Sequence, residues 1–151
     1  MSEPLHDRIQ LWIELPAKAD TVWAEIGDFG AIAEWHPDVV SAEIVEIEGD
    51  TYRHLRLAEG VLALERLVKT GERFYTSEIV ESPLPMENHR ATLSCVPEKE
   101  GCRVFWSAVF DPLDPIVDEI IEGFFETGLE ALRQRYGAPT PARRRRSGGA
   151  G

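Results

Sequence analysis

Apolar and polar residues alternate near the start of the chain, over residues 8–15. Every second residue of this segment is apolar, so four apolar side chains share one face: Ile9, Leu11, Ile13 and Leu15. Alternation with a period of two residues is typical of a strand with one buried face. The pattern therefore predicts a first strand, which ends at Pro16.

Two short helices are predicted between this strand and the next. Asp20 comes just before a run in which apolar residues follow a three-to-four spacing. An aspartate in that position is typical of a helix N-cap, so the pattern predicts a helix that Asp20 caps. Gly27 interrupts this helix, and residues 28–37 predict a second short helix that Pro37 stops.

Turn signals divide residues 39–110 into six predicted strands. The signals are clusters of Gly, Pro and acidic residues near residues 48–50, 59–60, 70–72, 83–85 and 98–101. Short strands separated by such clusters are typical of antiparallel sheets, in which neighbouring strands are joined by tight turns.

The last predicted element is a helix of about five turns. Apolar residues recur at helical spacing over residues 116–132, with acidic residues early and arginines late, as the helix dipole favours. Gly137 and Pro139 end the pattern. The order of elements predicts a single α+β domain over residues 1–137, with a seven-stranded antiparallel sheet and a long C-terminal helix.

Composition and charge narrow the class of protein. The 151 residues are 43% hydrophobic and carry a net charge of −11. That charge argues against nucleic acid and anionic membranes as partners, and no apolar run is long enough to insert in a membrane. Met1–His6 lacks the basic start and apolar run of a secretion signal, which predicts a cytoplasmic protein. The residue pattern does not indicate an oligomeric state.

The C-terminal tail, residues 138–151, differs from the rest of the chain. Four consecutive arginines, Arg143–Arg146, are followed by a serine and a glycine-rich end. Short basic and glycine-rich tails are usually disordered. The tail is therefore predicted to be disordered, and the fold to end near Tyr136.

Six short motifs follow one another along the chain: ADTVW at 19–23, GDFG at 27–30, WHP at 35–37, ERL at 65–67, SPLPM at 82–86 and WSA at 106–108. Their order, together with the order of the predicted elements, resembles the polyketide cyclase/dehydrase and lipid-transport group of the START-like, Bet v 1-like (SRPBCC) superfamily. The resemblance implies a helix-grip fold, in which the curved sheet wraps around the last helix and encloses a cavity. Such proteins include ring-forming enzymes, lipid carriers and metabolite binders, so the fold implies no single reaction.

Strand alternation predicts which side chains line this cavity. The predicted inward residues of the fifth, sixth and seventh strands include Tyr75, Ser77, His89, Leu93 and Trp106. Phe124 and Phe125 of the last helix are predicted to form the opposite wall. Trp35 is expected near the cavity mouth, either as a lid or as an anchor for the short helices. Ser77 stands where the resemblance implies a second aromatic residue, which suggests a wider or more polar pocket.

The pairing of the third and fourth strands decides whether two charged side chains face the cavity together. A three-residue loop at residues 58–60 places Arg53 opposite Glu65. Leu55 and Ala63 then face each other one step nearer the loop. A two-residue loop shifts the register by one residue and separates the charged pair.

Glu65, Tyr75 and His89 are the candidate catalytic residues, and each has a structural alternative. Glu65 beside Arg53 is either a structural ion pair or a general base. An inward His89 either moves a proton near neutral pH or satisfies a buried hydrogen bond. Tyr75 either orients a ligand oxygen or packs in the core and donates to the backbone.

Two functions fit this pattern. The first is binding of a hydrophobic, partly oxygenated small molecule, such as a polyketide, an aromatic compound or a lipid. The second is a polyketide cyclase or dehydratase reaction, in which Glu65 with His89 or Tyr75 moves protons during ring closure. The four histidines lack metal-ligand spacing and the glycines lack a dinucleotide-binding pattern, so we predict neither a metal nor a cofactor.

Overall fold

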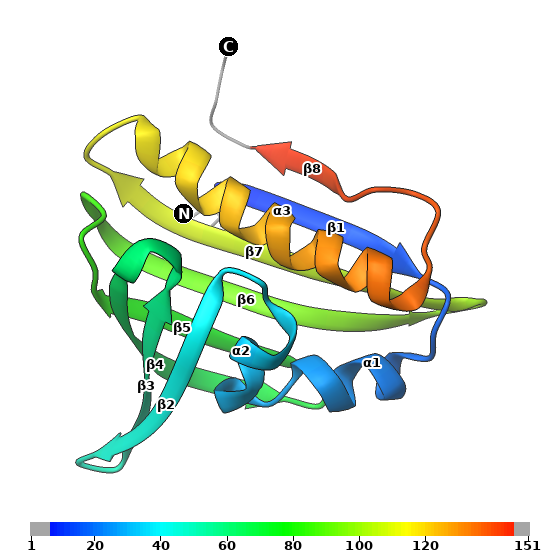
Figure 1. The fold of residues 1–151 in the computed structure, drawn as a ribbon, viewed down its shortest axis with the longest axis horizontal. Coiled ribbons are helices and arrows are strands. Elements are labelled where there is room, and N and C mark those ends of the chain that lie inside the picture. The colour runs from blue at the N-terminus through cyan, green and yellow to red at the C-terminus, as the bar shows by residue number, and fades with distance from the viewer. Residues whose placement is uncertain (1–6, 147–151) are drawn as a thin grey trace, which may run out of the picture.

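Eight antiparallel strands form one curved sheet in the computed structural model, which describes residues 7–146 (Figure 1). The strands lie in the order β2-β3-β4-β5-β6-β7-β1-β8. Their bounds are β1 Ile9–Leu15, β2 Val39–Ile47, β3 Asp50–Leu57, β4 Leu62–Gly71, β5 Phe74–Glu81, β6 Met86–Glu98, β7 Gly101–Pro112 and β8 Arg143–Arg146. The first seven strands confirm the predicted antiparallel sheet.

The helices lie on the concave face of this sheet, and one further helical turn, η2, joins β3 to β4. The helical segments are α1 Ala19–Ile26, the 3-10 turn η1 Phe29–Ala31, α2 Ile32–Trp35, the 3-10 turn η2 Ala58–Gly60 and α3 Ile116–Tyr136. Figure 1 shows α3 running along β7 and β1, while α1 contacts β6 and β7 and α2 contacts β2 at the far edge of the sheet. This is the predicted helix-grip arrangement. None of the helices within residues 7–146 combines the length and the apolar character needed to cross a bilayer.

The start of α1 differs from the prediction. The helix begins at Ala19, so Asp20 lies in its first turn and does not cap it. Lys18 takes the N-cap position, with an extended backbone and a carbonyl that accepts from the Val22 amide at 3.0 Å. The Asp20 carboxylate is instead bound by Arg73 at 3.0 Å, a partner far away in the sequence.

The prediction of a disordered tail is wrong for Arg143–Arg146, which form β8. This strand pairs antiparallel with β1, so that Arg143 lies opposite Trp12. Arg144 forms ion pairs with Glu122, at 2.7 Å, and with Glu126, both on α3. Acidic side chains of α3 thus offset the repulsion among neighbouring arginines. Residues 1–6 and 147–151, including the glycine-rich end, lie outside the described residues.

Aromatic side chains fill the space between α3 and the centre of the sheet. Trp106 of β7 stacks on Phe125 of α3, with 4.5 Å between ring centroids. A Cβ atom at Gly128 would lie 2.6 Å from Cδ2 of His36 and 2.8 Å from Cζ3 of Trp106. Helix and sheet therefore approach so closely that only glycine fits at residue 128.

Gly128→Ala is predicted to destabilise the protein by about 1–3 kcal/mol, the usual cost of extra volume in a packed core. Gly123→Ala is the matched control, because Gly123 lies in the same helix with open space around its Cα. This control should stabilise the protein by about 0.5–1 kcal/mol through better helix propensity. Urea unfolding measures both changes, and equal effects of the two substitutions would contradict the close approach at Gly128.

Candidate functional site

Arg53 is the centre of a buried hydrogen-bond network on the concave face. Its Nη1 donates to the Phe29 carbonyl at 2.9 Å and to the Tyr75 hydroxyl at 3.2 Å. Its Nη2 donates to Oε1 of Glu65 at 3.0 Å. The Ser77 hydroxyl donates to the same Oε1 at 3.0 Å. Four elements, η1, β3, β4 and β5, are therefore joined through one guanidinium group.

This network depends on the register of β3 and β4, and the predicted three-residue loop is confirmed. Arg53 lies opposite Glu65, and Leu55 lies opposite Ala63. Residues 58–60 form the turn η2 between the two strands. The ion pair therefore faces inward, as the alternation of side chains requires once this register is set.

The surroundings of Arg53 keep it charged although only 2% of the residue is exposed. Burial by itself lowers the pKa of Arg53, but the charge of Glu65 and the hydrogen bond to Tyr75 outweigh it, so the pKa is raised. The guanidinium also lies over the Phe29 ring, 4.1 Å from its centroid. Burial raises the pKa of Tyr75, which keeps its hydroxyl protonated at neutral pH.

Two positions in this network have no protein partner. Within residues 7–146, Oε2 of Glu65 receives no hydrogen bond, because both donors go to Oε1. The Nε atom of Arg53 is buried and has no acceptor among the described residues. One acceptor and one donor of the network are therefore unused.

His89 reaches the concave face next to an irregularity in β6. The pairing of β6 with β7 shifts by one residue between Glu87 and Arg90, and Asn88 has a φ of 56°. Such bulges redirect nearby side chains. Nδ1 of His89 accepts from the Ile79 amide at 3.2 Å, just beyond the end of the β5–β6 ladder.

At pH 7 the His89 ring is uncharged and can donate a hydrogen bond. Burial lowers its pKa, although the nearby Glu65 and Glu78 charges oppose that shift. Since Nδ1 already accepts a hydrogen bond, the proton of the neutral ring lies on Nε2. His89 does satisfy a buried backbone group, as the structural alternative requires, and its other nitrogen remains available to a ligand.

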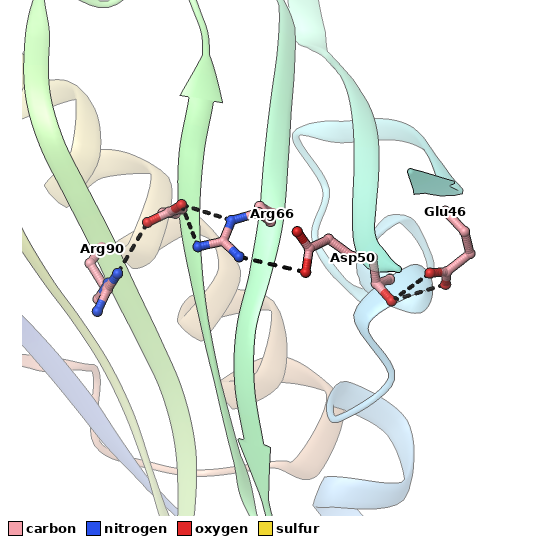
Figure 2. A network of polar contacts seen from close by, with 6 residues as sticks. Glu46, Asp50, Arg66 and Arg90 are labelled. Carbon is pink, nitrogen blue, oxygen red and sulfur yellow. Dashed lines mark hydrogen bonds and ion pairs between the residues drawn. The ribbon is translucent and has the colours of Figure 1, made fainter. Parts of the chain in front are cut away.

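The outer face of the same strands carries a separate ion-pair network (Figure 2). Arg66 follows Glu65 on β4 and binds Glu78 at 2.8 Å, with Asp50 at 3.9 Å on its other side. Glu78 also accepts from Arg90 at 3.2 Å. On β4, β5 and β6 a candidate site residue points inward and the next residue points outward into this network, so the outer pairs help to hold the candidate residues in register.

The aromatic candidates form a second cluster, beside α3. Trp35 lies 5.5 Å from Trp106 between ring centroids, and Trp106 contacts both Phe124 and Phe125. His36 stacks on Phe124 with 4.0 Å between centroids. Trp35 is only 4% exposed, so its packing is that of an anchor for α2. Leu93, opposite both Tyr75 and Trp106 in the sheet, lies between this cluster and the polar network.

Two residues of the site were not singled out from the sequence. Phe29 supplies a carbonyl and a ring face to Arg53. His36 donates from Nε2 to the Phe124 carbonyl at 2.7 Å and accepts from the Asp38 amide at 3.1 Å. Both lie within motifs that the sequence displays, GDFG and WHP, but a motif does not reveal which distant strand or helix its members contact.

Two pockets lie near the Arg53–Glu65 pair, at the end of the sheet where the β3–β4 and β5–β6 turns lie. The first has a volume of about 390 Å³, and Leu55 and Ala63 form part of its lining. The second has a volume of about 400 Å³ and is lined in part by Ile79 and His89. Neither lining includes Glu65, but Glu65 lies two residues from Ala63 on β4 and opposite Ile79 on β5, so it is close to a lining residue of each pocket.

The candidate acidic, thiol and imidazole groups do not gather into a metal site. Within residues 7–146, no three His, Cys, Asp or Glu side chains come together in a way that could hold a metal ion.

Comparison with known proteins identifies the family. A family model described as polyketide cyclase/dehydrase and lipid transport matches residues 6–137. The chain belongs to this family. No curated protein matches it.

Solved structures show the same fold. The protein XoxI from Bacillus cereus is 29% identical, with a TM-score of 0.78 over 85% of this chain and 94% of that one. A solution structure from Thermobifida fusca is 34% identical, with a TM-score of 0.74 over 85% and 91% of the two chains. A START superfamily protein from Mycobacterium smegmatis is 15% identical with a TM-score of 0.65, covering 87% and 99%, and shows the fold alone. Family and fold are consistent with hydrophobic-ligand binding or a cyclase role.

In this family member, Arg53→Met and Glu65→Leu are each predicted to destabilise the fold by about 3–5 kcal/mol, because each leaves one buried charge uncompensated. The double variant removes both charges. Its free energy of unfolding should therefore fall by much less than the sum of the decreases in the two single variants. Urea unfolding of the four proteins gives the coupling energy. Additive losses would contradict a coupled buried pair.

A second prediction concerns acid sensitivity. Burial lowers the pKa of His36 and of His89 below the ordinary value of 6.5. Between pH 6.5 and the lowered pKa values, these histidines are protonated in the unfolded chain and neutral in the folded chain. The free energy of unfolding therefore falls as the pH drops through this range. The slope is at most about 1.4 kcal/mol per pH unit for each histidine.

His36→Gln tests this prediction, because glutamine keeps an N–H donor for the Phe124 carbonyl and does not titrate. Urea unfolding at about pH 7.5, 6.5 and 5.5 should give a smaller slope in this variant than in the wild type. His54→Gln, at an exposed position of β3, is the control and should leave the slope as it is. If the free energy of unfolding of His36→Gln depends on pH as steeply as that of the wild type, then His36 does not contribute to the acid sensitivity.

Proposed function

We propose that the protein binds a hydrophobic, partly oxygenated small molecule on the concave face, between the β3–β4 and β5–β6 turns. The observation that carries this proposal is the position of the buried Arg53–Glu65 pair next to a lining residue of each of two pockets, Ala63 of the first and Ile79 of the second. Apolar walls with a few fixed polar groups are the usual composition of a small-molecule site. The family and fold support the same class of ligand.

The two kinds of residue have different tasks in this proposal. Leu55, Ala63 and Ile79 provide apolar surface, whose burial against the ligand supplies affinity at about 25 cal/mol per Å². Glu65 and His89 orient the oxygen-bearing part of the ligand, through an acceptor on Oε2 and a donor on Nε2. The aromatic cluster beside α3 forms the closed end of the site.

A cyclase or dehydratase reaction is the second candidate, favoured by the unused carboxylate oxygen of Glu65. A carboxylate that is held by Arg53 and Ser77 through one oxygen can take a proton on the other. His89 then serves as the hydrogen-bond donor to a carbonyl oxygen, since its ring is neutral. Tyr75, whose hydroxyl is bound to Arg53, positions the guanidinium in both candidates.

Ala63→Trp is predicted to block binding, because the indole fills the pocket beside Glu65. Val96→Trp is the matched control, since Val96 is an exposed apolar residue of β6 that lines neither pocket. Titration with aromatic polyketides, flavonoids and sterols, followed by backbone chemical shifts, should give saturable shifts in the wild type and Val96→Trp only. Equal binding by Ala63→Trp would overturn the proposed site.

The same mixtures decide between the two candidates when they are analysed for new products. Saturable binding without product supports a carrier or sensor. Product that is formed by the wild type and lost in Glu65→Gln supports the cyclase or dehydratase, because glutamine keeps the shape of the side chain and removes its basicity.

A further inference from the structure

The positive charge at the proposed site is already neutralised by the protein. Nη2 of Arg53 is bound to Glu65 at 3.0 Å, and Nη1 is shared between the Phe29 carbonyl and the Tyr75 hydroxyl. A ligand that approaches this network therefore meets an ion pair and not a free guanidinium. This matters for the choice of ligand, because a free buried arginine is the usual partner of a carboxylate.

The network leaves one acceptor for a ligand, and His89 supplies a donor near it. Oε2 of Glu65 has no donor among residues 7–146, and 10% of the Glu65 side chain is exposed. The Nε of Arg53 also has no acceptor in the described part of the chain, but it is enclosed by protein and out of a ligand's reach. The neutral His89 offers a donor, Nε2, at the neighbouring pocket. The site thus combines a negatively charged acceptor with a neighbouring donor.

A hydroxyl group matches this combination, because it donates one hydrogen bond and accepts others. It can donate to Oε2 of Glu65 while its oxygen accepts from a neighbouring N–H. A carboxylate has only acceptors and would bring a second negative charge beside Glu65. In a buried site that repulsion is only weakly screened, and Arg53 cannot offset two carboxylates at once.

We propose that the site selects an apolar molecule that carries a neutral hydroxyl group, a phenol or an alcohol, and rejects the corresponding carboxylic acid. This inference rests on the proposed function and narrows its substrate class. The hydroxyl binds at Glu65, and the apolar body lies against Leu55 and Ala63 in the adjacent pocket. Fatty acids and other carboxylates are thereby excluded as preferred ligands.

Three naphthalenes with the same ring system test the selectivity: 2-naphthol, 2-methoxynaphthalene and 2-naphthoate. The first has a donor, the second only an acceptor, and the third a negative charge. Isothermal titration and chemical shifts at neutral pH should show that 2-naphthol binds most tightly, 2-methoxynaphthalene less tightly and 2-naphthoate least tightly. We expect naphthol to bind about 10-fold more tightly than the ether, the usual effect of one hydrogen bond to a charged group, and about 100-fold more tightly than the carboxylate.

Two variants link the selectivity to the ion pair. In Glu65→Gln the charge of Arg53 is no longer neutralised, so naphthoate should gain at least about 10-fold relative to naphthol. The double variant Arg53→Met/Glu65→Leu removes both charges. Its affinities for naphthol and for the ether should then lie within about threefold of each other. This double variant keeps the test decisive if Glu65→Gln does not fold. Glu78→Gln is the control, because Glu78 lies on the outer face, and it should keep the wild-type order.

The outcomes separate this inference from the proposed function. If naphthoate or the ether binds the wild type as tightly as naphthol, and Ala63→Trp still blocks binding, the selectivity is wrong and the site stands. If all three compounds bind equally to the wild type and to Ala63→Trp, or none binds, the proposed site fails and the selectivity fails with it. The inference would also be overturned if Glu65→Gln and the double variant both bind the three naphthalenes in the same order of affinity as the wild type.

Discussion

The buried charge of Arg53 is the constraint on which the arrangement of the site depends. A guanidinium removed from water costs several kcal/mol unless its donors find acceptors. Here the acceptors come from the η1 turn, β4 and β5, as the Phe29 carbonyl, the Glu65 carboxylate and the Tyr75 hydroxyl. Each is held by a different element, so satisfying Arg53 requires the connector between β1 and β2 to dock against the concave face of the sheet. The pocket walls follow from that docking.

The two halves of the concave face differ in packing, and this difference sets where a ligand can lie. Beside α3, helix and sheet approach until only glycine fits at residue 128, and stacked rings such as Trp106 and Phe125 leave little room. Toward the β3–β4 and β5–β6 turns, the strand ladders carry register shifts, and two pockets lie close to the Arg53–Glu65 pair. The tightly packed half gives rigidity, and the polar half is left to recognise a ligand.

Much of the fold could be predicted from the sequence because strands and helices impose short periods on it. The alternation that placed Tyr75, His89 and Trp106 inward agrees with their burial. Of the two loop lengths that the sequence allowed at residues 58–60, the three-residue loop gives the Arg53–Glu65 register that the structure has. The errors arose where a distant partner replaced the local one. Asp20 is bound by Arg73 and does not cap α1, and the arginines of β8 are stabilised by the edge of β1 and by acidic residues of α3.

The sequence by itself determined which side chains share a face, because that depends only on the period of the backbone. It also determined the order of the elements and their turns. Only the tertiary structure decided which inward side chains meet: the Phe29 carbonyl at Arg53, His36 against α3, and His89 on the Ile79 amide. These contacts join segments far apart in the chain, and their geometry depends on sheet curvature, bulges and helix approach, which no local pattern of residues encodes.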